Sequence, residues 1–198
     1  RVTGLDYETA EGPGHIQADV IVNCGGMWGR DLALQNGVTL PLHACEHFYL
    51  ITEPVAGLDP MTPVLRVPDE CAYYKQDAGK MMLGAFEPKA KPWGMDGIRA
   101  DFEFDTLPED WDHFMPILEM ATNRLPLFET AGIHTFFNGP ESFTPDDRYY
   151  LGEAPEVKGV YVATGFNSIG IQSSGGAGLV LSKWIKNGYP PMDVNGID

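Results

Sequence analysis

Hydrophobic and polar positions divide the chain into three stretches of different character. In the first, an apolar run from Val20 to Cys24 ends in two glycines, and the run MWGRDLALQNG that follows has a helical pattern ending at Gly37. This order predicts a strand, a glycine turn and a helix. Before it, RVTGLDYE predicts a weakly alternating strand, and the Gly-Pro-Gly of TAEGPGH predicts a turn.

The middle stretch alternates with the period of strands. The segments LHACEHFYLIT, PVLRVP, CAYYKQD and KMMLGAFE are short and are separated by Pro, Gly and Asp, which predicts an antiparallel sheet. One longer segment, LPEDWDHFMPILEMATNRLPLF, predicts a helix with Pro108 near its first turn and acidic residues at its N-terminus. The segment GIHTFFNGPES then predicts another strand.

The last stretch returns to the first pattern, with a strand VYVA, a glycine loop GFNSIGIQSSGGAG and a helical run LVLSKWI. Unpaired N–H groups and the positive end of the helix dipole would meet at this loop and favour an anion or a partial negative charge. The late glycines are expected to let the helix pack closely on the sheet: Gly175, Gly176 and Gly178.

These three stretches predict an α/β fold with an insertion. We expect residues 1–39 and 143–198 to form one α/β domain and residues 40–142 to form an antiparallel domain inserted into it. Ligand sites favour such domain junctions and the carboxyl ends of strands. The organisation therefore predicts a cofactor site covered by a substrate site.

Composition narrows the class of protein. The apolar content of 43% in 198 residues supports a real core, and no apolar run is long enough to span a membrane. A net charge of -15 argues against nucleic acid or an anionic membrane as partner. The 3 cysteines form no C-x-x-C motif, so we expect buried free thiols in a reducing compartment and a cytoplasmic protein.

Two groups of side chains are candidates for chemistry. Strand period places His43, Cys45 and His47 on one face, which would suit zinc or copper in a metal-dependent hydrolase; a single functional histidine is the other interpretation. Tyr73 shares a face with Lys75, where its hydroxyl could orient a substrate or simply pack in the sheet.

Four segments in this order resemble the flavin amine-oxidoreductase family of the D-amino-acid oxidase type, and within it the dimethylglycine and sarcosine dehydrogenases. They are ADVIVNCGGMWGRDL, HFYLITEP, CAYYKQDAGKMMLGAFEP and FFNGPESFTPDDRYYLGEAPEVKGVYVATGFNSIGIQSSGGAGLVLSKWI. The resemblance implies a partial FAD/NAD(P)-binding Rossmann-like domain joined to an antiparallel substrate domain. It implies FAD as cofactor and oxidation of an N-methyl amino acid by hydride transfer.

The resemblance also implies roles for individual residues. His47 and Tyr73 match positions that face the substrate, and Trp28 matches a position at the cofactor. Sarcosine oxidases of the wider family carry a lysine where this chain has Gln172, a departure that favours a dehydrogenase over an oxidase. The loop that lies along the flavin matches Gly165, Phe166, Asn167, Ser168, Ile169, Gly170, Ile171 and Gln172.

By the same resemblance the chain is expected to be a piece of a longer protein. The N-terminal half of the FAD site would precede Arg1, and a folate-binding domain would follow Asp198. We therefore expect residues 1–198 alone to bind FAD poorly and to be inactive. A non-catalytic binding module, or a regulatory remnant of a flavoprotein, is the alternative to an enzyme.

Overall fold

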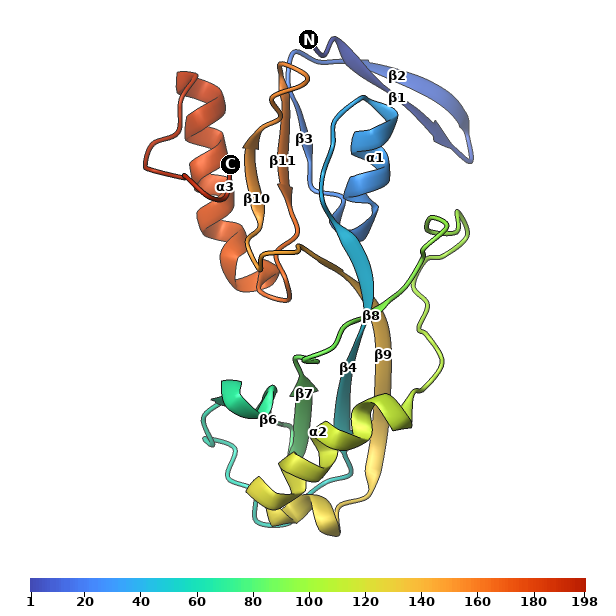
Figure 1. The fold of residues 1–198 in the computed structure, drawn as a ribbon, viewed down its shortest axis with the longest axis vertical. Helices are drawn as coiled ribbons and strands as arrows, with labels where there is room; N and C mark the ends of the chain where they lie inside the picture. Colours follow the sequence, from blue (N-terminus) through green and yellow to red (C-terminus); the bar gives the residue numbers. More distant parts are fainter. The chain divides into compact units, whose positions relative to one another are not determined.

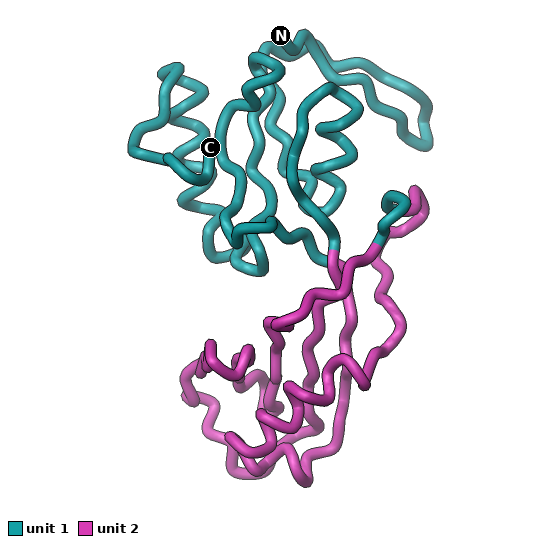
Figure 2. The backbone as a smooth tube through the Cα atoms, viewed as in Figure 1, with its two compact units in different colours: residues 1–44, 94–98, 141–198 teal, residues 45–93, 99–140 magenta.

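The computed structural model describes residues 1–198, a mixed α/β fold in two compact units (Figure 2). Unit 1 contains residues Arg1–Ala44, Gly94–Ile98 and Glu141–Asp198, and unit 2 contains Cys45–Trp93 and Arg99–Pro140. The chain passes from one unit to the other within two long strands, β4 (His43–Thr52) and β9 (Ile133–Phe143), and also on either side of Gly94–Ile98. The assignment of residues 1–39 and 143–198 to FAD binding stays a prediction, as does that of residues 40–142 to substrate binding.

Unit 1 is built on a three-stranded sheet in the order β10-β11-β3. The central strand pairs antiparallel with β10 and parallel with β3, so β3 forms an edge of the sheet. The strands are β10 (Tyr150–Glu153), β11 (Val160–Thr164) and β3 (Ile21–Asn23).

Helices pack on both faces of this sheet (Figure 1). Because side chains alternate along a strand, β11 presents Val162 to one face and Tyr161 to the other. Val162 packs in a cluster with Ala33 of α1 (Gly29–Gln35), and Tyr161 packs with Leu181 of α3 (Gly170–Asn187). A three-layer arrangement therefore positions the loop between β11 and α3 at the end of the sheet.

The N-terminal hairpin corrects one expectation. Strands β1 (Gly4–Thr9) and β2 (Gly12–Gln17) meet at a turn over residues 10–11, so the Gly-Pro-Gly lies inside β2 and not in the turn. Gly14 pairs with Tyr7, and a Cβ on Gly14 would lie 2.3 Å from the Tyr7 ring. The glycine makes room for a ring across the hairpin, which a turn signal in the sequence does not reveal.

Unit 2 contains the expected antiparallel sheet, with strand order β5-β6-β7-β4-β8 and β9 paired with β4. One face packs on α2, whose Phe114, Ile117 and Ala121 meet Phe48 and Leu83 in the core. The elements are β5 (Leu65–Val67), β6 (Ala72–Asp77), β7 (Lys80–Ala85), β8 (Lys91–Pro92) and α2 (Trp111–Arg124). Three short 3-10 helices complete the chain: Gly26–Trp28, Pro68–Glu70 and Pro126–Glu129.

Two helix starts differ from the sequence prediction. Helix α2 begins at Trp111 because the Asp110 side chain accepts a hydrogen bond from the His113 N–H at 3.0 Å, so Pro108 lies before the helix. Helix α3 begins at Gly170, well before the expected run at Leu179.

The glycines near the start of α3 therefore lie inside the helix, and their expected role is wrong. A Cβ at Gly175, Gly176 or Gly178 would meet no atom within 4 Å, so these glycines do not bring the helix close to the sheet. Buried Ala177 and Leu181 make that contact.

The cysteines also correct a prediction. All three are free, yet only Cys45 is buried, whereas Cys71 is half-buried and Cys24 is exposed. Cys71 follows a 3-10 turn with φ 52°, so it does not lie in a strand. None of the helices combines the length and the apolar character that a membrane crossing requires.

Candidate functional site

The face of the unit 2 sheet opposite α2 carries the predicted substrate-side residues. Tyr74 is buried in the core beneath α2, so strand alternation turns Tyr73 to the opposite face, as the sequence predicted. On β4, Phe48 and Leu50 belong to the same core, which places His47 on that opposite face as well. We call the face of the unit 2 sheet opposite α2 its open face.

A glycine that the sequence analysis missed holds the Tyr73 ring. Gly84 of β7 pairs directly with Tyr73, and a Cβ at this position would lie 1.9 Å from Cζ of the tyrosine. The ring therefore occupies the space above Gly84. The signal in the sequence is a lone glycine inside a strand, which marks a close approach without saying of what.

His47 is held by a carboxylate that the sequence analysis also missed. Its Nδ1 lies 2.9 Å from Oε2 of Glu87, and the other oxygen of Glu87 accepts the Phe48 N–H at 3.0 Å. The side chains of His47 and Glu87 are 15% and 6% exposed, respectively. An ionised carboxylate only accepts hydrogen bonds, so Nδ1 of His47 carries the proton of this bond.

Phe86 is the centre of the cluster. The rings of His47 and Tyr73 each lie 5.8 Å from the ring of Phe86, centre to centre. The guanidinium of Arg66 lies over the same ring at 4.3 Å. The open face thus gathers an imidazole, a phenol and a cation around one apolar ring.

The expected metal set is not formed. No group of three or more His, Cys, Asp or Glu side chains in the chain could hold a metal ion. His47 is bound to Glu87, and burial together with the nearby Glu87 charge raises the pKa of the Cys45 thiol, which opposes the thiolate that zinc requires. The metal-dependent hydrolase is therefore not supported.

In unit 1, side-chain hydrogen bonds shape the glycine loop between β11 and α3. Gly165, Asn167 and Ser168 all have positive φ, at 71°, 49° and 68°. The Asn167 side chain accepts the Thr144 N–H at 2.8 Å and donates to Thr144 Oγ1 at 2.9 Å, and Ser168 Oγ donates to Glu141 at 2.7 Å. These bonds hold the two non-glycine residues in a conformation that asparagine tolerates and serine rarely adopts.

The loop delivers backbone donors at the start of α3. The first turn has no side-chain cap and no acidic residue, so the N–H groups of Gly170, Ile171 and Gln172 have no partner in the chain. Ile169 differs from the expectation, because its N–H is bonded to the Phe166 carbonyl at 2.9 Å. The free backbone donors at the start of α3 are thus those of Gly170, Ile171 and Gln172, a smaller set than the loop from Gly165 to Gln172 that resembles the flavin loop.

The first glycine turn lies at the carboxyl end of β3. Asn23 accepts the Gly25 N–H at 3.0 Å and donates to the Gly29 carbonyl at 2.8 Å, so one side chain closes the turn. Trp28 is 43% exposed at the end of this turn. Its indole is not used in the core, which leaves it available to contact a ligand.

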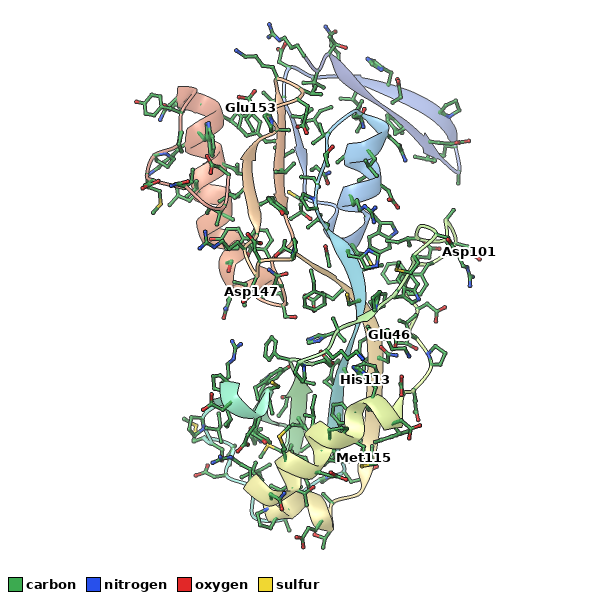
Figure 3. The ribbon with its side chains drawn as sticks, viewed as in Figure 1. Glu46, Asp101, His113, Met115, Asp147 and Glu153 are labelled. Carbon is green, nitrogen blue, oxygen red and sulfur yellow. The ribbon has the colours of Figure 1, made fainter.

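A polar cluster in unit 2 has a structural role. Asn138 donates to the Glu46 carboxylate at 2.7 Å, and Lys91 lies 3.1 Å from the same carboxylate and 2.7 Å from Asp110 (Figure 3 labels Glu46). The Lys91 ammonium holds the pKa of Asp110 below its usual range. These bonds join β4, β9, β8 and the start of α2 on the side away from Tyr73.

Comparison with known proteins identifies the family. The model of the FAD-dependent oxidoreductase family matches residues 1–184. The chain belongs to this family. Its members bind FAD, so FAD is the cofactor against which we compare the loop between β11 and α3.

Curated relatives cover the whole chain. The mouse pyruvate dehydrogenase phosphatase regulatory subunit is 40% identical over 100% of this chain. Human sarcosine dehydrogenase is 37% identical over 100% of it, and mouse dimethylglycine dehydrogenase is 32% identical over 98%. The chain spans 22%, 21% and 23% of these relatives, respectively, or about a fifth of their length.

Solved structures confirm the fold. L-proline dehydrogenase from P. horikoshii matches 99% of this chain with a TM-score of 0.78 and 20% identity. Glycine oxidase from Geobacillus kaustophilus matches 100% of it with a TM-score of 0.75 and 22% identity. The chain corresponds to 49% of each of those proteins.

The donors of unit 1 fit one end of FAD. The flavin ring has carbonyl oxygens that accept hydrogen bonds and gain negative charge on reduction, and the first turn of α3 offers uncapped N–H groups and contains no acidic residue. This donor set suits the ring end of the cofactor. Neither glycine turn of residues 1–198 has the G-x-G-x-x-G spacing that serves the diphosphate.

Proposed function

We propose that the protein oxidises N-methylated amino acids of the sarcosine or dimethylglycine type and releases the demethylated amine. The observation that carries the proposal is the His47–Glu87 pair beside Tyr73, on the sheet of a chain that belongs to the FAD-dependent oxidoreductases. Relatives named sarcosine dehydrogenase and dimethylglycine dehydrogenase support the choice of substrate.

The chemistry requires a free lone pair on the substrate nitrogen. When bound, FAD would supply the acceptor for a hydride from the N-methyl carbon of the substrate. The resulting imine takes up water, which supplies the oxygen of formaldehyde, and separates into formaldehyde and the demethylated amine. A substrate that arrives as an ammonium ion must first lose a proton.

His47 is proposed as the group that favours the neutral amine. Glu87 accepts from Nδ1–H, which makes the other ring nitrogen, Nε2, the proton acceptor. An imidazole with a carboxylate on its far nitrogen also tolerates the positive charge that it gains. The Tyr73 hydroxyl would orient the amine, and the Phe86 ring keeps this part of the face apolar.

Unit 1 is proposed to stabilise the reduced cofactor. The N–H groups of Gly170, Ile171 and Gln172 and the positive end of the α3 dipole would bind the ring carbonyls, and exposed Trp28 would contact the cofactor. Preorganised donors of this kind act without reorganisation when charge develops. Gln172 stands where sarcosine oxidases carry a lysine, so we propose an electron acceptor other than oxygen.

We further propose that another segment completes the FAD site and binds beside β3. This strand has one partner, β11, and an apolar groove of about 410 Å³ next to it is lined by Val22, Phe166, Leu181 and Ile185, among others. An unpaired parallel edge beside an apolar groove suits an added strand and helix. Residues 1–198 alone should then bind FAD poorly and be inactive; a yellow, flavin-loaded preparation of them would contradict this.

The test of the main proposal is flavin reduction in the holoprotein, by which we mean the FAD-loaded protein that includes the segment completing the FAD site. His47→Ala and Tyr73→Phe should slow the bleaching of the flavin by sarcosine or dimethylglycine in stopped flow, while FAD stays bound. Lys75→Met serves as a control, because Lys75 lies on the same strand face but pairs with Asp77 at 3.6 Å. Unchanged rates in both variants would remove these side chains from the mechanism.

A non-catalytic role is the second candidate, since one relative, 40% identical, is named a regulatory subunit. Such a protein would bind FAD, or a partner, without turning over an amine. The visible spectrum of the purified protein, followed during incubation with a panel of N-methyl amines, separates the two functions. Loss of the flavin absorbance with any of them decides for the enzyme.

A further inference from the structure

Arg66 lies in the same row as Tyr73 across the unit 2 sheet. On the edge strand β5, Arg66 pairs with Tyr73 of β6, and Tyr73 pairs in turn with Gly84 of β7. Directly paired residues point to the same face of a sheet, so the three positions form one line on the open face. The arginine is thus placed beside the phenol that the proposed function assigns to substrate orientation.

The guanidinium is held in place without being neutralised. It lies 4.3 Å above the Phe86 ring, a cation–π contact that fixes its position and leaves its N–H donors free to bind an anion. Arg66 forms no ion pair, although acidic residues outnumber basic ones by 28 to 13 in this chain. An unpaired, stacked arginine in such an acidic protein is a ready receptor for a carboxylate.

Two other cations, Lys75 and Arg148, have different surroundings. Lys75 shares the face but lies 3.6 Å from Asp77, which already supplies its counter-charge. Arg148 belongs to unit 1, where its guanidinium fills the space beside Gly196. Arg66 alone among the three contacts the ring around which His47 and Tyr73 are gathered.

We infer that Arg66 binds the carboxylate of the substrate and thereby selects amino acids over simple amines. This inference rests on the proposed function and names the residue that determines its substrate class. The planar guanidinium offers two parallel N–H donors to a carboxylate, a geometry that a lysine does not reproduce. Because Glu87 is engaged by His47 and the Phe48 N–H, it does not compete for Arg66.

The test compares Arg66→Met and Arg66→Lys with Lys75→Met in the flavin-loaded holoprotein. Loss of charge-assisted hydrogen bonds should raise KM for sarcosine about ten- to hundredfold in Arg66→Met, with a smaller change in kcat. Arg66→Lys should recover only part of the loss. Lys75→Met removes the same charge from the same face and should leave KM within about twofold.

Two further measurements separate this inference from the proposed function. Sarcosine methyl ester has no carboxylate, so its KM should be the same in the wild type and Arg66→Met. Acetate is not oxidised, and its Kd, from titration calorimetry of the holoprotein, should rise by the same factor as the KM for sarcosine. Equal acetate affinity in the wild type and Arg66→Met overturns the inference, whether or not any amine is oxidised; absence of oxidation with intact acetate discrimination overturns only the proposed function.

Discussion

Substituting Gly84 by alanine tests whether the position of the Tyr73 ring matters. The new Cβ would lie 1.9 Å from Cζ and 2.3 Å from Oη of Tyr73. Carbon atoms in contact sit about 3.5–4.0 Å apart, so the ring must move by roughly 1.5–2 Å. The obstacle is the outer end of a half-buried side chain, so we expect the ring to swing away while the β6–β7 pairing persists.

Two consequences of this displacement can be estimated. Inserting a methyl group into an occupied space costs about 1–3 kcal/mol of unfolding free energy. For a protein of this size each kcal/mol lowers Tm by roughly 2–4 °C. Misplacing a reacting group by about 1 Å can slow a reaction on the order of a hundredfold, so flavin reduction should slow by a similar factor.

The assay is stopped-flow flavin reduction by sarcosine, together with thermal unfolding of the same holoprotein. The double variant Tyr73→Ala/Gly84→Ala removes the clash, so it should be no less stable than Tyr73→Ala alone, while its flavin reduction stays slow. Gly175→Ala is a matched control, because its Cβ meets no atom within 4 Å. A Gly84→Ala protein with wild-type stability and a wild-type rate would refute the reasoning.

Three further predictions concern the loop, the polar cluster and the thiols. Asn167→Ala should lower the free energy of unfolding, measured in urea, by about 2–4 kcal/mol, because it loses two hydrogen bonds and places alanine at φ 49°. Asn167→Gly loses the same bonds but tolerates this φ, so its loss should be about 1 kcal/mol smaller. Equal losses in the two variants would contradict the role of φ. The pKa of Asp110 is lowered in the fold, so its pairing with Lys91 stabilises the protein above about pH 4 and is lost as pH falls through the lower, folded-state value. Lys91→Met should therefore flatten the acid side of the stability profile, measured by urea unfolding at several pH values; an unchanged slope would show no coupling. Iodoacetamide should alkylate exposed Cys24 before buried Cys45, whose pKa is raised by burial, and mass spectrometry showing the reverse order would contradict the described burial.

Local pattern predicted much of unit 2. The alternation of CAYYKQD turned Tyr73 and Tyr74 to opposite faces correctly, because the period of two is a property of the strand itself. The antiparallel sheet followed from short strands separated by turn residues. Each of these conclusions depends on neighbours in sequence, which a pattern can report.

Helix α3 shows where pattern gave the wrong answer. Glycine costs about 1 kcal/mol per helical position relative to alanine, so GIQSSGGAG reads as a loop. In the fold, the burial of Ala177 and Leu181 against the sheet favours helix from Gly170 onward and outweighs that propensity. For this reason the loop between β11 and α3 is shorter than the sequence indicated, and fewer N–H groups act as donors.

The amino-acid sequence by itself determined the order of the main elements, the opposite faces of Tyr73 and Tyr74 and, through resemblance, the family. Only the tertiary structure decided which distant residues act on those positions: Glu87 on His47, Gly84 beneath Tyr73, Thr144 on Asn167 and Phe86 beneath Arg66. Those partners come from other strands or from loops, and strand register is what brings Gly84 beneath Tyr73. Pairing register depends on the packing of the whole sheet, whereas a sequence pattern records only the period of each strand.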